Sequence, residues 1–406
     1  MPERRLGVLR LATRLHLIVA AGVLVVGLVA LPSFPDGVSK KTGTSAGTTA
    51  VSTTATSVPP VRPATSCPPP TTERPAMVGG RVTVGMAINA DESDLCGQLR
   101  VLYEGGVRFL RADFSWDRAE PAPGHFDWAA TDRFMSAAAD VGLDVLAIVD
   151  YSARWASSDP DGNGDVAYPP NDSSAYASYA AAVVSRYGPG GEFWTGRARA
   201  RALAAVELWN EPWGWFFWKP EPDPAAYAGL ARQAAQAVKN ANPGVKVVVP
   251  ADVEQSRQDD AEAPWFDAVL AAEPGLADVV DVWSVHPYPH PRSSGPVAPD
   301  DGDFGRVATT YLIAGERGAT RPVWITEIGW SSAVKADGGT TEENQAAFLG
   351  AALDRVAAEW PFVDHVFVYS WDTSSGDPTD LEGNFGLRRT ASTTKPAWAA
   401  LMSRLA

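Results

Sequence analysis

The chain has 406 residues, of which 45% are hydrophobic, and a formal net charge of −14. A chain of this length and composition can bury one large core, which excludes a short peptide-like module. The negative charge opposes a phosphate backbone, and no basic stripe offsets it over the C-terminal three quarters of the chain. We therefore expect no nucleic acid partner.

Residues 1–35 have the pattern of an export segment. Four arginines, the last of them Arg14, precede an uncharged apolar run over residues 17–31. A basic region followed by such a run is typical of a signal peptide. The run is shorter than the roughly 20 residues that a spanning helix prefers. The residues on either side of it add little charge, however, so an uncleaved membrane anchor stays open. The segment is thus a cleaved signal peptide or an uncleaved membrane anchor, and we expect the protein to lie outside the cytoplasm, secreted or anchored.

Residues 36–76 are rich in Thr, Ser and Pro and contain no aromatic side chain. Such a segment buries too little apolar surface to offset the entropy of ordering, so it is predicted to be a disordered linker. The only two cysteines are Cys67 and Cys96. Few thiols and an oxidising compartment are compatible with a disulfide between them, and two unpaired thiols remain the alternative.

From residue 77 to residue 406, short β-branched runs alternate with longer Ala-rich stretches, a pattern typical of parallel strands with helical crossovers. Eight units over this length predict one α/β domain, a (β/α)₈ TIM barrel, which we expect to be a monomer. Asp223 before Pro224, and Thr341, are predicted helix caps. The predicted strands are 81–89, 107–114, 144–150, 204–210, 245–250, 279–286, 323–327 and 365–371, and the predicted helices are 92–104, 128–141, 173–187, 224–240, 261–272, 304–317, 342–359 and 396–405.

Two glutamates end predicted strands. The fourth strand runs into Asn-Glu-Pro at 210–212, and the seventh runs into Thr-Glu-Ile-Gly-Trp at 326–330. In a barrel the active site forms at the C-terminal ends of the strands, so Glu211 and Glu327 should meet at one rim. A glycosidic bond breaks when one carboxylic acid protonates the leaving oxygen and a carboxylate attacks the anomeric carbon. We therefore expect Glu211 to be the acid/base and Glu327, kept ionised by Arg111 and Tyr288, to be the nucleophile.

An aromatic segment follows the first of these glutamates. Residues 213–218 read Trp-Gly-Trp-Phe-Phe-Trp, which is too apolar for a solvated loop. Pyranose rings stack on aromatic faces while their hydroxyl groups bind carboxylates and amides. Trp213 and Trp215 are thus predicted to bind substrate, and a carbohydrate is the expected partner.

These motifs resemble the clan A glycoside hydrolases, in which Asn-Glu-Pro ends strand four and a glutamate ends strand seven. The resemblance spans residues 81 to about 405. Trp218-Lys-Pro, Asp223-Pro and Ser284-Val-His-Pro-Tyr-Pro are similar to the family 39 type. The resemblance implies a retaining hydrolase that acts on β-linked sugars. It also implies five residues around the reacting sugar: Arg111, Asn210, His286, Tyr288 and Trp371. The third strand departs from the pattern, because it ends in Asp150-Tyr151 where many relatives have histidine or asparagine.

We expect neither a metal nor a cofactor, since the five histidines and two cysteines form no ligand spacing. Two other functions stay open. A barrel that binds carbohydrate without turnover would keep the fold and the aromatic segment. A transglycosylase that remodels surface glycan would use the same covalent intermediate while excluding water.

Overall fold

The structure is a computed structural model that describes residues 66–89, 94–253, 264–289, 294–295 and 304–405. All of these residues belong to one compact unit. The predicted export segment and residues 36–65 of the predicted linker lie outside the described residues. Within the described ranges, no helix combines the length and the apolar character needed to cross a bilayer.

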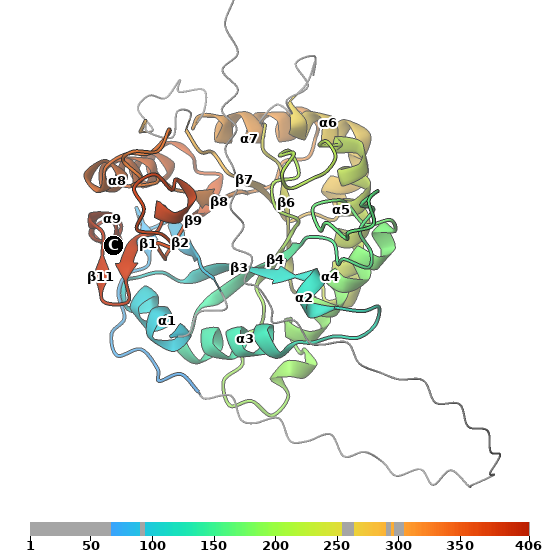
Figure 1. The fold of residues 1–406 in the computed structure, drawn as a ribbon, viewed down its shortest axis with the longest axis horizontal. Coiled ribbons are helices and arrows are strands. Elements are labelled where there is room, and N and C mark those ends of the chain that lie inside the picture. The colour runs from blue at the N-terminus through green and yellow to red at the C-terminus, as the bar shows by residue number, and fades with distance from the viewer. Residues whose placement is uncertain (1–65, 90–93, 254–263, 290–293, 296–303, 406) are drawn as a thin grey trace, which may run out of the picture. The chain divides into compact units, whose positions relative to one another are not determined.

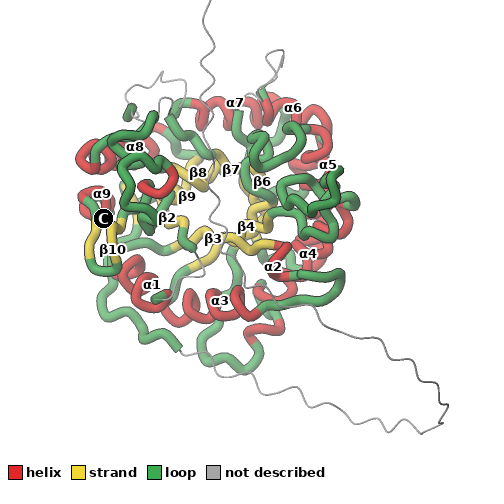
Figure 2. Tube along the Cα trace, viewed as in Figure 1, coloured by secondary structure: helices red, strands yellow, loops and turns green. Residues whose placement is uncertain are grey.

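Eight parallel strands, β2 to β9, close into a barrel in which β2 is hydrogen-bonded to both β3 and β9. Figure 1 looks along this barrel and shows its helices outside the ring of strands; Figure 2 separates the two layers by colour. The predicted TIM barrel is confirmed. The strands are β2 (Val82–Ala87), β3 (Phe109–Ser115), β4 (Asp144–Asp150), β5 (Ala205–Leu208), β6 (Lys246–Pro250), β7 (Val282–Val285), β8 (Val323–Ile328) and β9 (Val363–Val368).

Helices follow the strands in the predicted order. Asp223 caps α5 by accepting hydrogen bonds from the backbone N–H groups of Ala225 and Ala226, both at 2.9 Å, and Thr341 caps α8 in the same way. These contacts satisfy N–H groups that have no partner inside the helix. The helices are α1 (Leu95–Glu104), α2 (Trp116–Ala119), α3 (Ala129–Val141), α4 (Ser173–Tyr187), α5 (Pro224–Ala241), α6 (Trp265–Ala272), α7 (Arg306–Glu316), α8 (Glu342–Glu359) and α9 (Pro396–Met402), with short 3₁₀ turns at Glu192–Trp194, Pro274–Asp278 and Glu382–Asn384.

Three short strands lie outside the closed barrel. Strand β1 (Met77–Val78) pairs antiparallel with β2, and β10 (Arg388–Thr390) forms a hairpin with β11 (Thr393–Thr394). The hairpin precedes α9 and lies beside α8 and α9 (Figure 1).

The barrel interior is apolar near the beginnings of the strands. Trp324 lies edge-on to Phe109, with ring centroids 5.7 Å apart, and both pack with Phe367. Leu146, Ala205, Val248 and Val282 complete this buried cluster. Since apolar side chains fill this half, the polar interior residues lie toward the C-terminal ends of the strands, as is usual for the fold.

Several predicted strands end earlier than expected, and two of these differences lie at the polar end of the barrel. The strand predicted over 204–210 stops at Leu208, because Trp209 has a positive φ of 76° that breaks the extended backbone. The strand predicted over 365–371 occupies Val363–Val368. Both differences change which side chains face the barrel interior.

Residues 66–76, assigned to the linker by composition, are part of the folded unit. Cys67 is 3% exposed and forms a disulfide with Cys96 of α1, and its backbone N–H donates a hydrogen bond to Asp140 Oδ2 at 2.8 Å. The disulfide settles the choice between paired and unpaired thiols. Closing a loop across 29 positions stabilises the fold by roughly 3–4 kcal/mol in the chain-entropy model, which explains why this stretch is held on the barrel despite its composition.

Candidate active site

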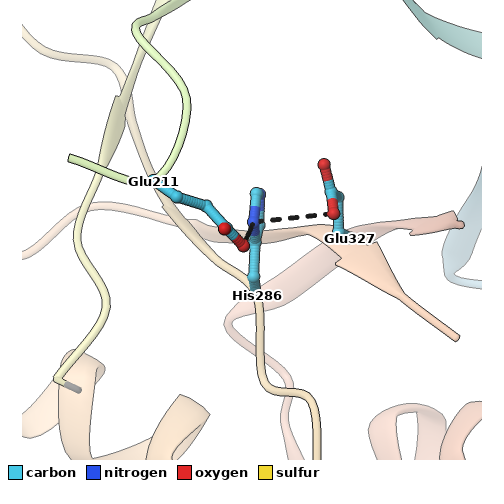
Figure 3. A group of neighbouring side chains, drawn as sticks. All are labelled: Glu211, His286 and Glu327. Carbon is cyan, nitrogen blue, oxygen red and sulfur yellow. Dashed lines mark hydrogen bonds and ion pairs between the residues drawn. The ribbon is translucent and has the colours of Figure 1, made fainter. Parts of the chain in front are cut away.

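The two strand-end glutamates meet at the C-terminal end of the barrel. Glu211 follows β5, Glu327 lies in β8, and His286, just after β7, lies between them (Figure 3). One carboxylate oxygen of each glutamate and one ring nitrogen of His286 all lie within 4.8 Å of one another. Glu211 and His286 are 75 positions apart in the chain, and the barrel closure brings both of them to Glu327.

The backbone that presents Glu211 is strained. Trp209 and Glu211 have φ angles of 76° and 42°, a left-handed region that side chains other than glycine seldom adopt. Trp209 is held there by a hydrogen bond from its indole Nε1 to the carbonyl of Phe217 at 2.8 Å. Such strain costs on the order of 1–3 kcal/mol per residue and tends to occur at functional sites. Here it turns Glu211 toward His286.

Glycine allows the strand that carries Glu327 to approach its neighbour. A Cβ atom on Gly329 would lie 2.0 Å from the carbonyl oxygen of Tyr369, which follows β9. Only glycine fits this position without moving the backbone. The Glu-Ile-Gly segment therefore keeps the ends of β8 and β9 close together.

Arg111 on β3 is the central buried cation. Its guanidinium donates to Glu207 Oε2 at 2.7 Å, to Glu327 Oε1, and to Asn210 Oδ1 at 2.9 Å. The side chain is almost completely buried. Burial alone would lower the pKa of Arg111, but the charges of Glu207 and Glu327 outweigh it and raise the pKa. A permanently charged, planar donor thus orients both the nucleophile candidate and the asparagine that precedes the acid/base candidate.

Glu327 is held as a carboxylate. Tyr288 donates its hydroxyl hydrogen to Glu327 Oε2 at 2.8 Å, and Arg111 binds the other oxygen. Burial by itself would raise the pKa of Glu327, but His286, Arg111 and the Tyr288 hydroxyl together hold it below its usual range. The sequence expectation that Arg111 and Tyr288 keep this residue ionised agrees with these contacts.

His286 links the two glutamates. Its Nδ1 lies 2.7 Å from Glu211 Oε1 and 3.8 Å from Glu327 Oε2. Its Nε2 lies 3.0 Å from the Thr326 hydroxyl, which itself donates to Glu207 Oε1 at 2.8 Å. Because that hydroxyl hydrogen is already used, its oxygen can only accept, which places a proton on Nε2. Nδ1 and Glu211 then share one further proton.

The pKa of His286 reflects this position. Burial would lower the pKa, but the nearby charge of Glu327 and the hydrogen bond to Glu211 outweigh it and raise the pKa above its ordinary value. The imidazole therefore holds its proton more readily than a free histidine, and the short contact with Glu211 gives a path for proton transfer between the two.

Sequence reasoning missed Glu207, Thr326 and Tyr151, which support the predicted residues. Glu207 is completely buried within β5, Thr326 joins it to His286, and the Tyr151 hydroxyl accepts from Asn210 Nδ2 at 3.2 Å. An available signal was the charged Glu207 inside an otherwise apolar strand, since a buried carboxylate requires a partner.

The two tryptophans predicted after Glu211 lie in different environments. Trp215 is 39% exposed and stacks on Phe216, with ring centroids 3.7 Å apart, so it can offer a face to a sugar. Trp213 is nearly buried and packs edge-on against His286 at 5.5 Å. It therefore supports the histidine from behind rather than presenting an open face to substrate.

Trp371 is a correction to the predicted site. It is buried, and its ring packs against Trp398 of α9 at 4.9 Å, so it belongs to the core under that helix. The residue that reaches the site from this strand end is Tyr369, whose ring lies 6.5 Å from that of Tyr288. Burial, and in addition the nearby charges of Glu327 and Glu211, raise the pKa of Tyr369. Because β9 ends at Val368, the side chain facing the site comes two positions earlier than expected.

A second acidic pair lies at the ends of β3 and β4. Asp150 is 4% exposed, and its Oδ1 has no hydrogen-bond partner among the described residues. Burial and the nearby charge of Asp113 raise the pKa of Asp150 well above its ordinary value. This is the strand end at which the sequence departs from its relatives.

Asp150 makes the stability of the protein depend on pH. A carboxyl group whose pKa is raised by folding stabilises the fold below its unfolded pKa, and this contribution is lost as the pH rises through the folded value. Asp150→Asn removes the titrating group, so it should raise the free energy of unfolding at pH 7.5 by about 1.4 kcal/mol for each unit by which folding raises this pKa. Near pH 4 the gain should vanish. Urea unfolding at both pH values measures this change in the free energy of unfolding, and Asp161→Asn, at an exposed position, is the control. Equal destabilisation by Asp150→Asn at both pH values would contradict this assignment.

Glu211, His286 and Glu327 could also supply three ligand atoms to a metal ion. However, the Arg111 guanidinium binds Glu327, and His286 is already hydrogen-bonded to Glu211. A divalent cation placed here would face a fixed positive charge and would have to break both contacts. The arrangement fits proton transfer between the glutamates and substrate better than metal binding.

Comparison with known proteins finds two family models that each match part of the chain. A family model described as the glycosyl hydrolase catalytic core matches residues 195–390, and one described as beta-galactosidase matches residues 89–149. The chain is similar to the clan A glycoside hydrolases. No curated protein matches the sequence. The first family match contains both Glu211 and Glu327.

Solved glycoside hydrolases share the fold. A family 39 glycoside hydrolase from the gut symbiont Bacteroides cellulosilyticus WH2 superposes with a TM-score of 0.61 at 24% identity, over 81% of this chain and 65% of that one. A monomeric beta-xylosidase from Caulobacter crescentus CB15 gives 0.58 at 17% identity, over 81% and 69%. Xylanase B from Clostridium stercorarium F9 gives 0.53 at 17% identity, over 81% and 99%. The chain thus spans less than two thirds of the family 39 enzyme.

These likenesses confirm the resemblance inferred from the motifs and the TIM-barrel fold that it implies. Within this barrel, β5 and β8 are the fourth and seventh strands of the ring. Glu211 and Glu327 therefore occupy the two strand ends at which the clan carries its acid/base and its nucleophile.

Proposed function

We propose that this protein is a retaining glycoside hydrolase that cleaves β-glycosidic bonds by double displacement, with Glu327 as nucleophile and Glu211 as acid/base. The observation that carries the proposal is the gap between the two carboxylates. Oxygens of Glu211 and Glu327 lie within 4.8 Å of each other. Retaining enzymes hold their carboxyl groups about 5–5.5 Å apart, whereas inverting enzymes need roughly 6.5–9.5 Å to admit a water molecule.

The environment of Glu327 supports its role in the first step. A carboxylate oxygen attacks the anomeric carbon, and the bond from that carbon to the leaving oxygen breaks. Glu327 must be ionised for this, and Arg111 and Tyr288 stabilise the charged form. Once the ester forms, the charge on Glu327 disappears, and Arg111 remains neutralised by Glu207.

The contact between Glu211 and His286 supports the proton transfers. Glu211 delivers a proton to the leaving oxygen in the first step and removes one from the incoming water in the second. His286 Nδ1, at 2.7 Å from Glu211, can share the proton between turnovers. His286 is thus a positioning residue in this scheme, because it acts on substrate through Glu211.

Asn210, Tyr369 and Trp215 are the proposed sugar-binding residues. Asn210 is fixed by Arg111 and Tyr151, so its amide is oriented before substrate arrives. Trp215 offers an exposed aromatic face beyond Glu211. The acidic residues around the glutamates disfavour a negatively charged sugar at the cleaved bond itself.

The N-terminal pattern adds a proposal on location. The apolar run at 17–31 lies outside the described residues, and the proposal that the protein is exported rests on that pattern. The disulfide between Cys67 and Cys96 supports it, since such bonds persist in oxidising compartments. We propose action outside the cytoplasm as a monomer, with any membrane contact made through the N-terminal segment.

A panel of xylan, glucan, mannan and microbial exopolysaccharides, with detection of released reducing ends, tests the activity. Hydrolysis of at least one β-linked glycan is expected, and NMR of the first products should show the β anomer. An α anomer as first product would overturn the retaining mechanism. Products longer than the substrate would indicate a transglycosylase. Binding of a glycan without any product would indicate a carbohydrate-binding barrel.

A further inference from the structure

A polar cavity of about 330 Å³ lies at the edge of the barrel, apart from the paired glutamates. It is formed by the loops after β8 and β9, the start of α8 and the β10–β11 hairpin, segments that Figure 1 shows side by side near α9. Its lining is rich in hydroxyl groups and charges and includes Ser332, Glu342, Thr373, Ser375, Arg389 and Lys395. Nothing in the proposed hydrolysis uses these residues.

Lys395 is a buried cation without a carboxylate partner. Lys395 is 3% exposed, and its Nζ donates to Ser332 Oγ at 2.9 Å and to the carbonyl of Asn384 at 2.8 Å. Both acceptors are neutral. Among the described residues no carboxylate lies within ion-pair distance of Nζ, so one of the three ammonium N–H groups has no partner there. Buried lysines are rare unless their charge is paired, because the charged form is costly to desolvate.

The other charges of the cavity do not compensate Lys395. Glu342 is engaged by Arg389, whose Nε donates to Oε1 at 2.8 Å and whose Nη2 binds Oε2. This pair is internally neutral, so the cavity keeps one positive charge in a chain of net charge −14. Burial lowers the pKa of Lys395 to about 8, and the ammonium form therefore still predominates at neutral pH.

The cavity lies at the same end of the barrel as the catalytic pair. Ser332 follows β8, which carries Glu327. Asn384 directly precedes Phe385, whose ring lies 5.4 Å from that of Tyr369 and 5.9 Å from that of Tyr288. The ring of Phe385 thus connects the lining of the cavity to Tyr288, which binds Glu327.

We propose that this cavity binds an acidic saccharide through an oxyanion, foremost the carboxylate of a uronic acid, with Lys395 as the cation that receives it. The unpartnered N–H of Lys395 would bind the oxyanion, and the hydroxyls of Ser332, Thr373 and Ser375 would bind the hydroxyl groups of the sugar. The site is separate from the cleaved bond, so it would select polymers that carry acidic residues beside neutral ones.

Isothermal titration calorimetry of the full chain with D-glucuronate, D-glucose and inorganic phosphate, at pH 6.5 and constant ionic strength, tests the proposal. Glucuronate is expected to bind at least about tenfold more tightly than glucose or phosphate. Lys395→Met should weaken glucuronate binding by about tenfold or more, and Lys395→Arg, which keeps the charge, should retain most of it. Lys335→Met, an exposed lysine of a neighbouring loop, should leave it unchanged.

A measurement on the unaltered protein covers the case in which Lys395→Met fails to fold. Raising the pH from 6.5 to 9.5 removes the proton from Lys395 and should weaken glucuronate binding by roughly tenfold or more. Unchanged affinity in Lys395→Met, or affinity independent of pH, would overturn the proposal. Equal affinities for phosphate and glucuronate would overturn the statement that the ligand is a saccharide. Because the readout is binding, a failure to hydrolyse any glycan would not affect the result.

Discussion

Replacing Glu327 with glutamine is expected to reduce kcat on every β-glycan that the protein hydrolyses by at least about 10⁴-fold. An amide is uncharged and a poor nucleophile, so the glycosyl-enzyme cannot form. The residue is nearly isosteric, and Arg111 keeps its contact with Glu207 at 2.7 Å, so the fold should persist. Initial rates on the glycan identified by the panel measure the effect.

The control for this change is Glu316→Gln, an exposed glutamate at the end of α7, which should leave kcat unaltered. Thermal unfolding of both variants verifies that they are folded. A 2-deoxy-2-fluoro glycoside should label the unaltered protein on the peptide that contains Glu327, because it slows the second step and the ester accumulates. Retention of activity in Glu327→Gln, or a label on another peptide, would remove Glu327 from the mechanism.

Glu211→Gln should show a loss that depends on the leaving group. On unactivated glycosides, where the leaving oxygen needs a proton, kcat/KM should fall by about 10²–10⁴-fold. On a dinitrophenyl glycoside, whose leaving group departs without a proton, the first step should be nearly unchanged. The second step then limits turnover, because no base activates water, and the glycosyl-enzyme accumulates.

Azide distinguishes this role of Glu211 from a structural one. As an anion that needs no base, azide should attack the accumulated intermediate, restore turnover on the dinitrophenyl glycoside, and yield a β-glycosyl azide. Glu316→Gln again serves as the matched control and should show no azide effect. Equal losses on both substrates, or turnover insensitive to azide, would argue against Glu211 as the acid/base.

Residue patterns were sufficient to predict the architecture. Short β-branched runs and Ala-rich helical stretches alternate eight times, and capping residues such as Asp223 and Thr341 occur where helices begin. These are local signals, since a strand or a helix start depends on a few neighbouring residues. The same reasoning located Glu211 and Glu327, because parallel strands all end at one face.

Local patterns failed where the backbone departs from regular geometry. The positive φ of Trp209 ends β5 early, and β9 ends at Val368. A change in where a strand ends alters which side chain faces the barrel, so Tyr369 lies at the site while Trp371 packs under α9. Side-chain direction alternates along a strand only while the strand continues.

The sequence predicts a barrel with a pair of glutamates at one rim from its length, its patterning and the two strand-end motifs. Each pattern and motif depends on residues that are close together in the chain. The partners of that pair depend on closure of the ring, which brings Arg111, Glu207 and His286 from three different strands into contact. The unpaired charge of Lys395 depends likewise on loops that meet only after folding. Contacts between distant segments follow from packing and charge compensation over the whole molecule, and no single stretch of sequence encodes them.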